Sequence, residues 1–267
     1  MLDILQTAAK EGGEVLLDYF SRQDDLVLQV KTTHQDFSTQ ADLEAQEIIS
    51  KSIIRQCTKK GIDKNEIGFI GEENLHIHGK HLFIIDPLDG TANFASGLEH
   101  FSVSIGYIYN GSLEAGFIYE PIKNISFAAQ KGKGAYKQED GTNTRLSIKK
   151  VPLKDCVMNA HFSSVKKVSS QLFPMYQKLL PRVRKLREYG AVTTSMACLA
   201  TNIFGLVING HCMIWDIAAA KLIIEEAGGT LVDFTGKEVV FDTNQPKKAY
   251  KVIACHPSNV EKIIHII

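Results

Sequence analysis

Residues 82–91 read Leu-Phe-Ile-Ile-Asp-Pro-Leu-Asp-Gly-Thr, an apolar run followed by two acids, a glycine and a hydroxyl residue. The run predicts a buried strand that ends at Asp86, where the proline turns the chain towards Asp89. Two acids on one turn suit hard divalent cations, which prefer oxygen ligands. The amides of Gly90 and Thr91 could face a phosphate group. Asp-Pro and Asp-Gly are also ordinary turn dipeptides, so metal-assisted phosphate chemistry needs support from elsewhere in the chain.

Further acids stand at the ends of other expected elements. Glu72 and Glu73 follow a short apolar strand, and Asp216 occupies the N-cap position of an expected helix that a Gly-Gly pair ends. Asp42 opens the segment 42–60, whose apolar residues recur at helical spacing. Each acid also has a simpler interpretation, as part of a charged loop or as a helix cap.

Three motifs that contain most of these acids occur in an order and at a spacing typical of one protein family. Weaker matches to the same family fill the gaps between them. The motifs are Gly71-Glu72-Glu73, residues 86–91 with Asn93-Phe94, and Trp215-Asp216 through Gly228-Gly229. The weaker matches are residues 31–42, 132–135 and 187–190. Over about residues 1–260 the chain resembles the inositol monophosphatase family of magnesium-dependent, lithium-sensitive phosphatases.

The resemblance implies an α/β class fold, the layered αβαβα sugar-phosphatase fold, in which the metal site lies between two lobes. Residues 1–145 would form an N-terminal α+β lobe with a largely antiparallel sheet and most metal ligands. Within it, Asn110-Gly111 is a strong hairpin signal. Residues 146–267 would form a C-terminal α/β lobe that contributes Asp216 and substrate contacts.

The resemblance also implies Mg²⁺ as cofactor, with two or three ions per site. Glu72, Asp86 and the backbone carbonyl of Leu88 would hold one ion. Asp86, Asp89 and Asp216 would hold another, so Asp86 would bridge the pair. In the version with three ions, Glu72 would also contact the third.

Catalytic roles follow from the same resemblance. Thr91, hydrogen-bonded to Asp42, would orient and help to deprotonate the attacking water, which the metal activates. Glu72 would share in catalysis, and Glu73 would support the site from behind it. The amides of Gly90 and Thr91 would hold the phosphate oxygens.

Substrate identity is less well determined. Asn93-Phe94 favours the inositol phosphatase group over relatives that act on 3′-phosphoadenosine nucleotides. Asn209, however, stands where family members that act on inositol phosphate usually carry a glutamate, and an amide has no charge. The full set of expected substrate contacts is Asp89, Gly90, Thr91, Val192, Asn209 and Asp216.

The predicted function is that of a Mg²⁺-dependent phosphoric monoester hydrolase, inositol-1-monophosphatase-like, acting on a small polyol or sugar phosphate. One alternative is a phosphatase of the same family that acts on fructose 1,6-bisphosphate, histidinol phosphate or a nucleotide phosphate. Another is a non-catalytic binding role in transcription or ribosome assembly. The presence of every expected metal acid favours the enzyme.

Composition agrees with this interpretation. The chain has 267 residues and no formal net charge, so nothing draws it to nucleic acid or to an anionic membrane. Its N-terminus is amphipathic, which is unlike a signal peptide, and no run reaches the ~18 apolar residues that a membrane span needs. We therefore expect a cytoplasmic protein, and the resemblance implies a homodimer that binds a small phosphate ester.

Overall fold

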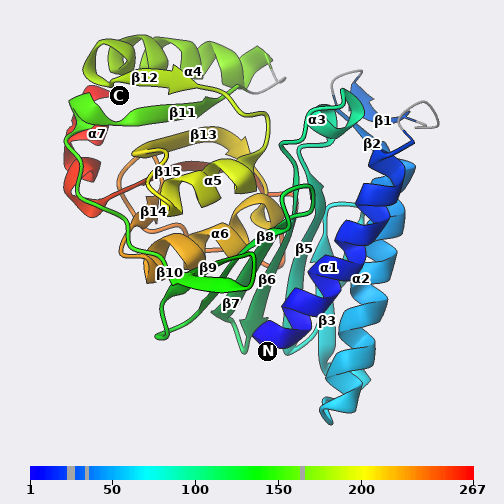
Figure 1. Cartoon of the computed structure of the whole chain (residues 1–267). Coiled ribbons are helices and arrows are strands. Elements are labelled where there is room, and N and C mark those ends of the chain that lie inside the picture. Colours follow the sequence, from blue (N-terminus) through cyan, green and yellow to red (C-terminus); the bar gives the residue numbers. More distant parts are fainter. Residues whose placement is uncertain (23–27, 34–35, 163–165) are drawn as a thin grey trace.

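The computed structural model describes residues 1–22, 28–33, 36–162 and 166–267. Two large β-sheets alternate with helices, so the molecule is built in α-β-α-β-α layers (Figure 1). The predicted fold class is thereby confirmed. None of the helices within the described ranges is long and apolar enough to cross a membrane.

The first sheet has eight strands in the order β10-β9-β8-β7-β6-β5-β3-β4, and only β3 and β5 pair in parallel. This confirms the largely antiparallel sheet that the sequence predicts. Its strands are β3 (Ile67–Gly71), β4 (Leu75–Ile77), β5 (His81–Asp89), β6 (Ser102–Tyr109), β7 (Ser112–Glu120), β8 (Ile125–Gln130), β9 (Ala135–Glu139) and β10 (Thr142–Arg145).

The second sheet has five strands in the order β12-β11-β13-β15-β14. β11 pairs in parallel with both β12 and β13, whereas β15 is antiparallel to both of its neighbours. The strands are β11 (Val157–His161), β12 (Lys185–Arg187), β13 (Leu206–Cys212), β14 (Thr230–Val232) and β15 (Tyr250–Cys255). A separate antiparallel pair joins β1 (Leu28–Thr33) to β2 (Asp36–Thr39). Within the segment 31–42 that carries part of the family resemblance, residues 34 and 35 lie outside the described residues.

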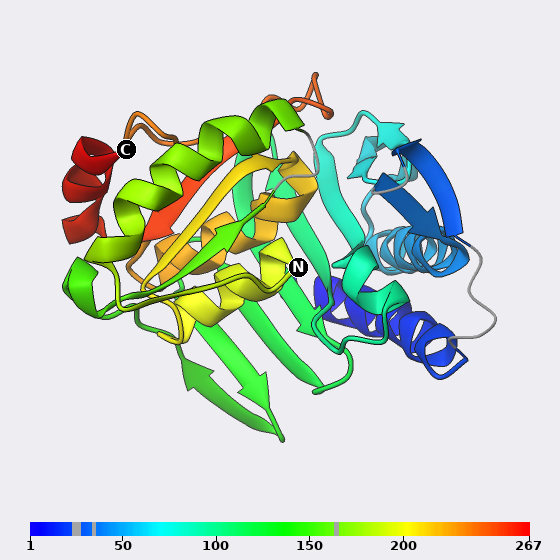
Figure 2. The same ribbon diagram turned by 90° about the horizontal axis from the view of Figure 1, so that it is seen from above.

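The helices form three groups around the sheets (Figure 2). α1 (Leu2–Phe20) and α2 (Gln40–Lys59) cover the outer face of the first sheet, and α5 (Val192–Ala200) and α6 (Ile214–Glu226) fill the space between the two sheets. α4 (Lys166–Leu179) and α7 (Val260–Ile266) cover the outer face of the second sheet. The short α3 (Thr91–Ala95) follows β5. The predicted division of the chain at residue 145 stays a prediction.

Strand β5 explains why the opening sequence is an unbroken apolar run. Phe83 and Ile85 pack with α1 and α2, whereas Leu82 and Ile84 face the core between the sheets. A strand that is buried on both faces needs apolar residues at every position instead of alternating ones. The run therefore places β5 between two hydrophobic cores, and the acids at its end are buried with it.

Two two-residue turns connect strands of the first sheet. Asn110 and Gly111 both have positive φ (48° and 80°), the conformation of a type I′ hairpin turn, so that prediction is confirmed. Asp140 and Gly141 do the same between β9 and β10 (48° and 74°). This second turn joins strands that are short and mostly polar.

Three boundaries in the sequence interpretation were wrong, and each has a physical reason. β5 does not end at Asp86; it continues to Asp89 through a break in register, where a proline costs no ladder hydrogen bond. Asp42 and Asp216 are the third residues of their helices, not the first. Each carboxylate accepts a hydrogen bond from the backbone N–H of the residue before the helix, Thr39 or Met213, as N3 acids do in capping boxes.

Helix α6 lies so close to the first sheet that only glycine fits beneath it. A Cβ on Gly116 would lie 2.6 Å from the carbonyl oxygen and 2.9 Å from the Cα of Ala219, and both of these are backbone atoms. A backbone atom cannot swing aside as the end of a side chain can. The position of α6, which carries Asp216, thus depends on a small residue in β7.

Replacing Gly116 with valine should therefore lower the free energy of unfolding by about 2 kcal/mol or more, because the helix must shift to admit the side chain. Thermal unfolding followed by circular dichroism would measure this, with Ser112→Val at the start of the same strand as the control. Equal melting temperatures for the two variants would contradict the close packing.

Candidate active site

The end of β5 forms the floor of the site. Asp86 is 1% exposed, and its Oδ1 accepts a hydrogen bond from the N–H of Leu88 at 3.1 Å. Burial raises the pKa of Asp86 well above its ordinary value, and the charges of Glu72, Asp89 and Asp216 raise it further. Because charges act on a buried acid chiefly from nearby, the four predicted metal acids lie in one region, in which Asp86 and Asp89 are buried and Glu72 and Asp216 are half-buried.

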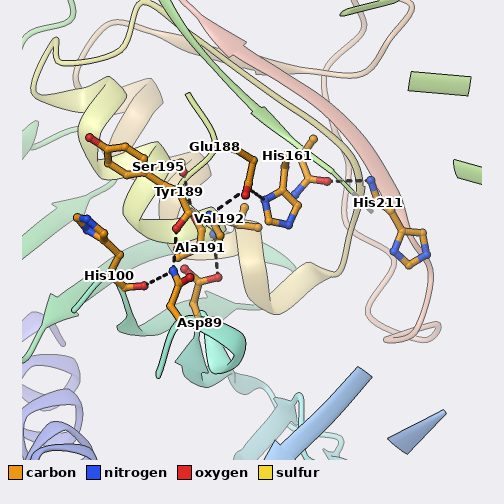
Figure 3. Close-up of polar contacts among 12 residues, drawn as sticks. Asp89, His100, His161, Glu188, Tyr189, Ala191, Val192, Ser195 and His211 are labelled. Carbon is orange, nitrogen blue, oxygen red and sulfur yellow. Dashed lines mark hydrogen bonds and ion pairs between the residues drawn. The ribbon is translucent and has the colours of Figure 1, made fainter. Parts of the chain in front are cut away.

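Asp89 ties the end of β5 to the start of α5 in this region (Figure 3). Its Oδ1 accepts from the N–H of Val192 at 2.9 Å, and its Oδ2 accepts from the N–H and hydroxyl of Thr193 at 2.8 and 2.6 Å. The acid thereby satisfies free N–H groups at the start of α5. Burial raises the pKa of Asp89, and these hydrogen bonds and the nearby His161 oppose that rise only in part.

Asp42 and Thr91 form a second buried pair. The hydroxyl of Thr91 donates to Oδ1 of Asp42 at 3.1 Å, and it lies 3.1 Å from the carbonyl oxygen of Leu88. Oδ2 of Asp42 accepts from the N–H of Thr39 at 2.7 Å. Burial raises the pKa of Asp42 to about 7; the bonds from Thr39 oppose this, and the charges of Glu72 and Glu73 add to it.

Gly90 makes the turn between β5 and α3. Its φ of +94° is a conformation that side chains rarely adopt, and an added Cβ would lie 2.9 Å from the carbonyl oxygen of His100. The glycine places the amides of Gly90 and Thr91 at the start of a helical turn. Glu73 is held by its backbone, since its N–H donates to Gln46 and its carbonyl oxygen accepts from the same amide.

The donor set fits a hard cation. Carboxylates from the β3–β4 loop, β5 and α6, together with the Leu88 carbonyl, supply only oxygen, which is what Mg²⁺ prefers. As the side chains stand, no group of three or more His, Cys, Asp and Glu residues that could hold a metal is found among the described residues. Asp89 and Asp216 instead accept hydrogen bonds from neighbouring backbone N–H groups. The fit of this region to Mg²⁺ therefore rests on the chemistry of its oxygen donors and on the burial of Asp86 and Asp89.

Two further predicted substrate contacts are Val192 at the start of α5 and Asn209 on β13 of the second sheet. The N–H of Val192 is directed at Asp89. Asn209 is 2% exposed; its Oδ1 accepts from the N–H of His211 at 2.8 Å, while its Nδ2 is buried without a hydrogen-bond partner. A buried amide nitrogen without a partner is costly unless it has a use.

Three residues near the site were not found from the sequence. Thr193 binds Asp89, and His161 faces Glu188, with 3.1 Å between Nδ1 of the imidazole and Oε1 of the carboxylate (Figure 3). A single histidine at the end of a short strand gives no motif. Only the pairing of strands β11, β12 and β13 brings these segments, far apart in sequence, into one place.

Comparison with known proteins gives one consistent result. A model of the inositol monophosphatase family matches residues 1–267. The chain is 31% identical to a fructose-1,6-bisphosphatase/inositol-1-monophosphatase of Thermotoga maritima, covering 89% of this chain and 86% of that protein. It is 32% identical to Nus factor SuhB of Pasteurella multocida, covering 100% and 95%. The crystal structure of extragenic suppressor protein suhB from Bartonella henselae superposes with a TM-score of 0.87 at 27% identity, covering 99% and 97%.

Proposed function

Since the chain belongs to the inositol monophosphatase family, we propose that it is a Mg²⁺-dependent phosphomonoesterase that hydrolyses a small polyol or sugar phosphate. One observation carries the proposal: Asp86 is buried among the charges of Glu72, Asp89 and Asp216. A fold gains nothing in stability from such repulsion, so a function for these acids is the better explanation.

Glu72, Asp86, Asp89, Asp216 and the carbonyl of Leu88 would hold the metal. When bound, Mg²⁺ neutralises these acids, lowers the pKa of a water molecule and stabilises the charge of the leaving oxygen. The number of ions, two or three, is part of the proposal.

The remaining roles belong to the chain itself. The amides of Gly90 and Thr91 would bind phosphate oxygens, since unpaired N–H groups at the start of a helical turn favour anions. The hydroxyl of Thr91, fixed by Asp42 at 3.1 Å, would orient the attacking water and pass its proton to Oδ1 of that acid. The charge of Glu73 would act on the Asp42–Thr91 pair from a position outside the set of metal ligands. Positioning and charge stabilisation do most of the work in phosphoryl transfer.

Removing the hydroxyl of Thr91 gives a specific kinetic result. Thr91→Ala should lower kcat by about 10²-fold and change KM little, because the hydroxyl orients water and hardly binds the ground-state substrate. Thr91→Ser, which keeps the hydroxyl, should retain most of the activity, and the exposed Thr58→Ala serves as a control. A rise in KM at constant kcat would count against the role.

The function is tested by phosphate release from a panel of esters, each with Mg²⁺ and with EDTA. The panel contains inositol 1-phosphate, fructose 1,6-bisphosphate, histidinol phosphate, 3′-phosphoadenosine 5′-phosphate and NADP. We expect Mg²⁺-dependent release, strongest from a polyol or sugar phosphate. A folded protein that releases phosphate from none of them would contradict the proposal.

A second candidate comes from the relatives named Nus factor SuhB. A non-catalytic role in transcription or ribosome assembly would not need the acids of the site. It would therefore survive Asp86→Asn in a complementation assay, whereas a role that depends on hydrolysis would not. We also expect a homodimer, which sedimentation analysis of the purified protein would show.

A further inference from the structure

A row of polar side chains lies on the inner face of the second sheet, next to the site. In the parallel pair β11 and β13, Asn159 stands opposite Val207, and His161 stands opposite Asn209. Met158, Ala160 and Ile208, at the alternate positions, pack in the outer core, whereas Val207 packs in the core between the sheets. The polar row therefore faces α5 and the start of that helix, where Asp89 binds.

The row contains most of the buried polar atoms that have no hydrogen-bond partner within the described ranges. They are Nδ2 of Asn209, Nδ1 of His161 and both polar side-chain atoms of Asn159; Asn209 is 2% exposed and Asn159 is 0% exposed. Nearly all buried polar groups in folded proteins are paired, so this group of donors and acceptors marks a surface built for a polar partner. His161 stands at its outer end with a side chain 24% exposed.

Glu188 fixes the orientation of His161. Its carboxylate accepts from the N–H of Gly190 at 3.0 Å and lies 3.1 Å from Nδ1 of His161. Burial raises the pKa of Glu188, but the nearby His161 and the bond from Gly190 outweigh this effect and lower it below the ordinary value. Nδ1 of His161 is thus within ion-pair distance of the carboxylate although it makes no hydrogen bond of good geometry there, and Nε2 on the other side of the ring is left for another partner.

We infer that His161 and Asn209 together recognise hydroxyl groups on the alcohol part of the substrate, and that Glu188 is the positioning residue for His161. The inference rests on the proposed function. Paired positions on neighbouring strands lie ~5 Å apart, so the two side chains can reach adjacent hydroxyls of one polyol. A hydroxyl both donates and accepts, which suits Nε2 of the imidazole and the amide nitrogen of Asn209. Family members that act on inositol phosphate usually carry one charged acceptor, a glutamate, at the position of Asn209. This chain instead has two polar groups there, Asn209 on β13 and His161 on β11.

The arrangement in Figure 3 agrees with this role. His161 and Glu188 approach from β11 and from the segment after β12, beside Val192 and Asp89. His161 is also near enough to Asp89 to influence that acid electrostatically. A leaving group attached to a phosphate at Gly90 and Thr91 would extend towards this edge of the second sheet.

The test compares two esters that differ only in their hydroxyls, myo-inositol 1-phosphate and cyclohexyl phosphate, both assayed with Mg²⁺. The proteins are the wild type, His161→Leu, Glu188→Gln, the double variant, and His265→Leu as a control on the exposed side of α7. The quantity of interest is the ratio of kcat/KM for the two esters. Cyclohexyl phosphate reports the basal phosphatase activity.

We expect His161→Leu to lower this ratio about tenfold, through KM for the inositol ester. Glu188→Gln should lower the ratio less than His161→Leu does. It should have no further effect in the double variant, because a positioning residue acts only through its partner. The control should match the wild type.

An unchanged ratio in His161→Leu, or equal losses on both esters, would overturn the inference. If that variant does not fold, His161→Asn decides the matter by the same ratio, since the shorter amide cannot reach the same hydroxyl. Additive losses in the double variant would overturn the role of Glu188. Failure of the wild type to hydrolyse either ester would also overturn the inference, whereas the proposed function is refuted only if the whole panel of esters named above gives no phosphate release.

Discussion

Replacing Asp86 with asparagine is expected to abolish Mg²⁺-dependent phosphate release and, in EDTA, to raise the melting temperature. Loss of an acid that would hold Mg²⁺ should reduce kcat/KM by about 10³-fold or more. The gain in stability follows from the pKa of Asp86, which burial and the charges of Glu72, Asp89 and Asp216 raise well above 3.8. The two effects have opposite signs in one variant, which distinguishes a site acid from a structural one.

The sign of the stability effect can be worked out directly. An acid whose pKa rises on folding destabilises the folded state at every pH above its unfolded pKa, and the penalty grows until the pH passes the folded pKa. Near neutral pH asparagine removes this penalty, and its oxygen can still accept from the N–H of Leu88. We expect about 1–2 kcal/mol, or ~2–6 °C for a chain of this size.

Calorimetry in EDTA would measure the effect of the buried charge on stability, and calorimetry in Mg²⁺ would measure the stabilisation by bound metal. The wild type should gain stability from Mg²⁺, whereas Asp86→Asn should not, because a ligand raises the melting temperature only of the state that binds it. Asp140→Asn is the matched control, because this residue has positive φ in a hairpin turn, where asparagine fits equally well. A variant with normal turnover, or one less stable than the wild type in EDTA, would contradict the assignment.

Asp89→Asn should abolish turnover as well, but with the opposite effect on stability. The carboxylate accepts three hydrogen bonds, from the N–H of Val192 and from the N–H and hydroxyl of Thr193. An amide has one acceptor atom, so its NH₂ group must face one of the two backbone N–H groups. An unpaired buried N–H costs about 1–3 kcal/mol.

The comparison that matters is between the two asparagine variants in EDTA. Both remove a buried charge, so the difference in their melting temperatures isolates the hydrogen bonds that Asp89 makes. We expect Asp89→Asn to unfold at the lower temperature of the two. If Asp89→Asn proved as stable as Asp86→Asn, the attachment of α5 to β5 through this carboxylate would be refuted.

The sequence predicted most of the first sheet and singled out the acids that the structure places around Asp86, because both depend on local signals. The run at 82–85 reads as a strand that is buried on both sides, and Asn110-Gly111 reads as a turn. The motifs that contain Glu72, Asp86 and Asp216 are each contiguous. The structure of each of these segments can be predicted without knowing which other segments it contacts.

What the sequence did not predict depends on contacts between distant segments. The bonds from Asp89 to Thr193 join residues 104 positions apart, and His161 meets Glu188 only because β11 and β12 pair in parallel. Capping also misled the reading of Asp42 and Asp216, because an acid at the third position of a helix looks like an N-cap in sequence. Side-chain partners were therefore the weakest part of the sequence interpretation.

The bonds between Asp89 and the start of α5 also limit how the molecule can move. Asp89 stands at the end of β5 in the first sheet, and its partners belong to the first turn of α5, in the helix layer between the two sheets. A motion that parted this helix from the first sheet would break three buried hydrogen bonds. Any opening or closing motion that keeps these bonds has to come from other segments of the chain.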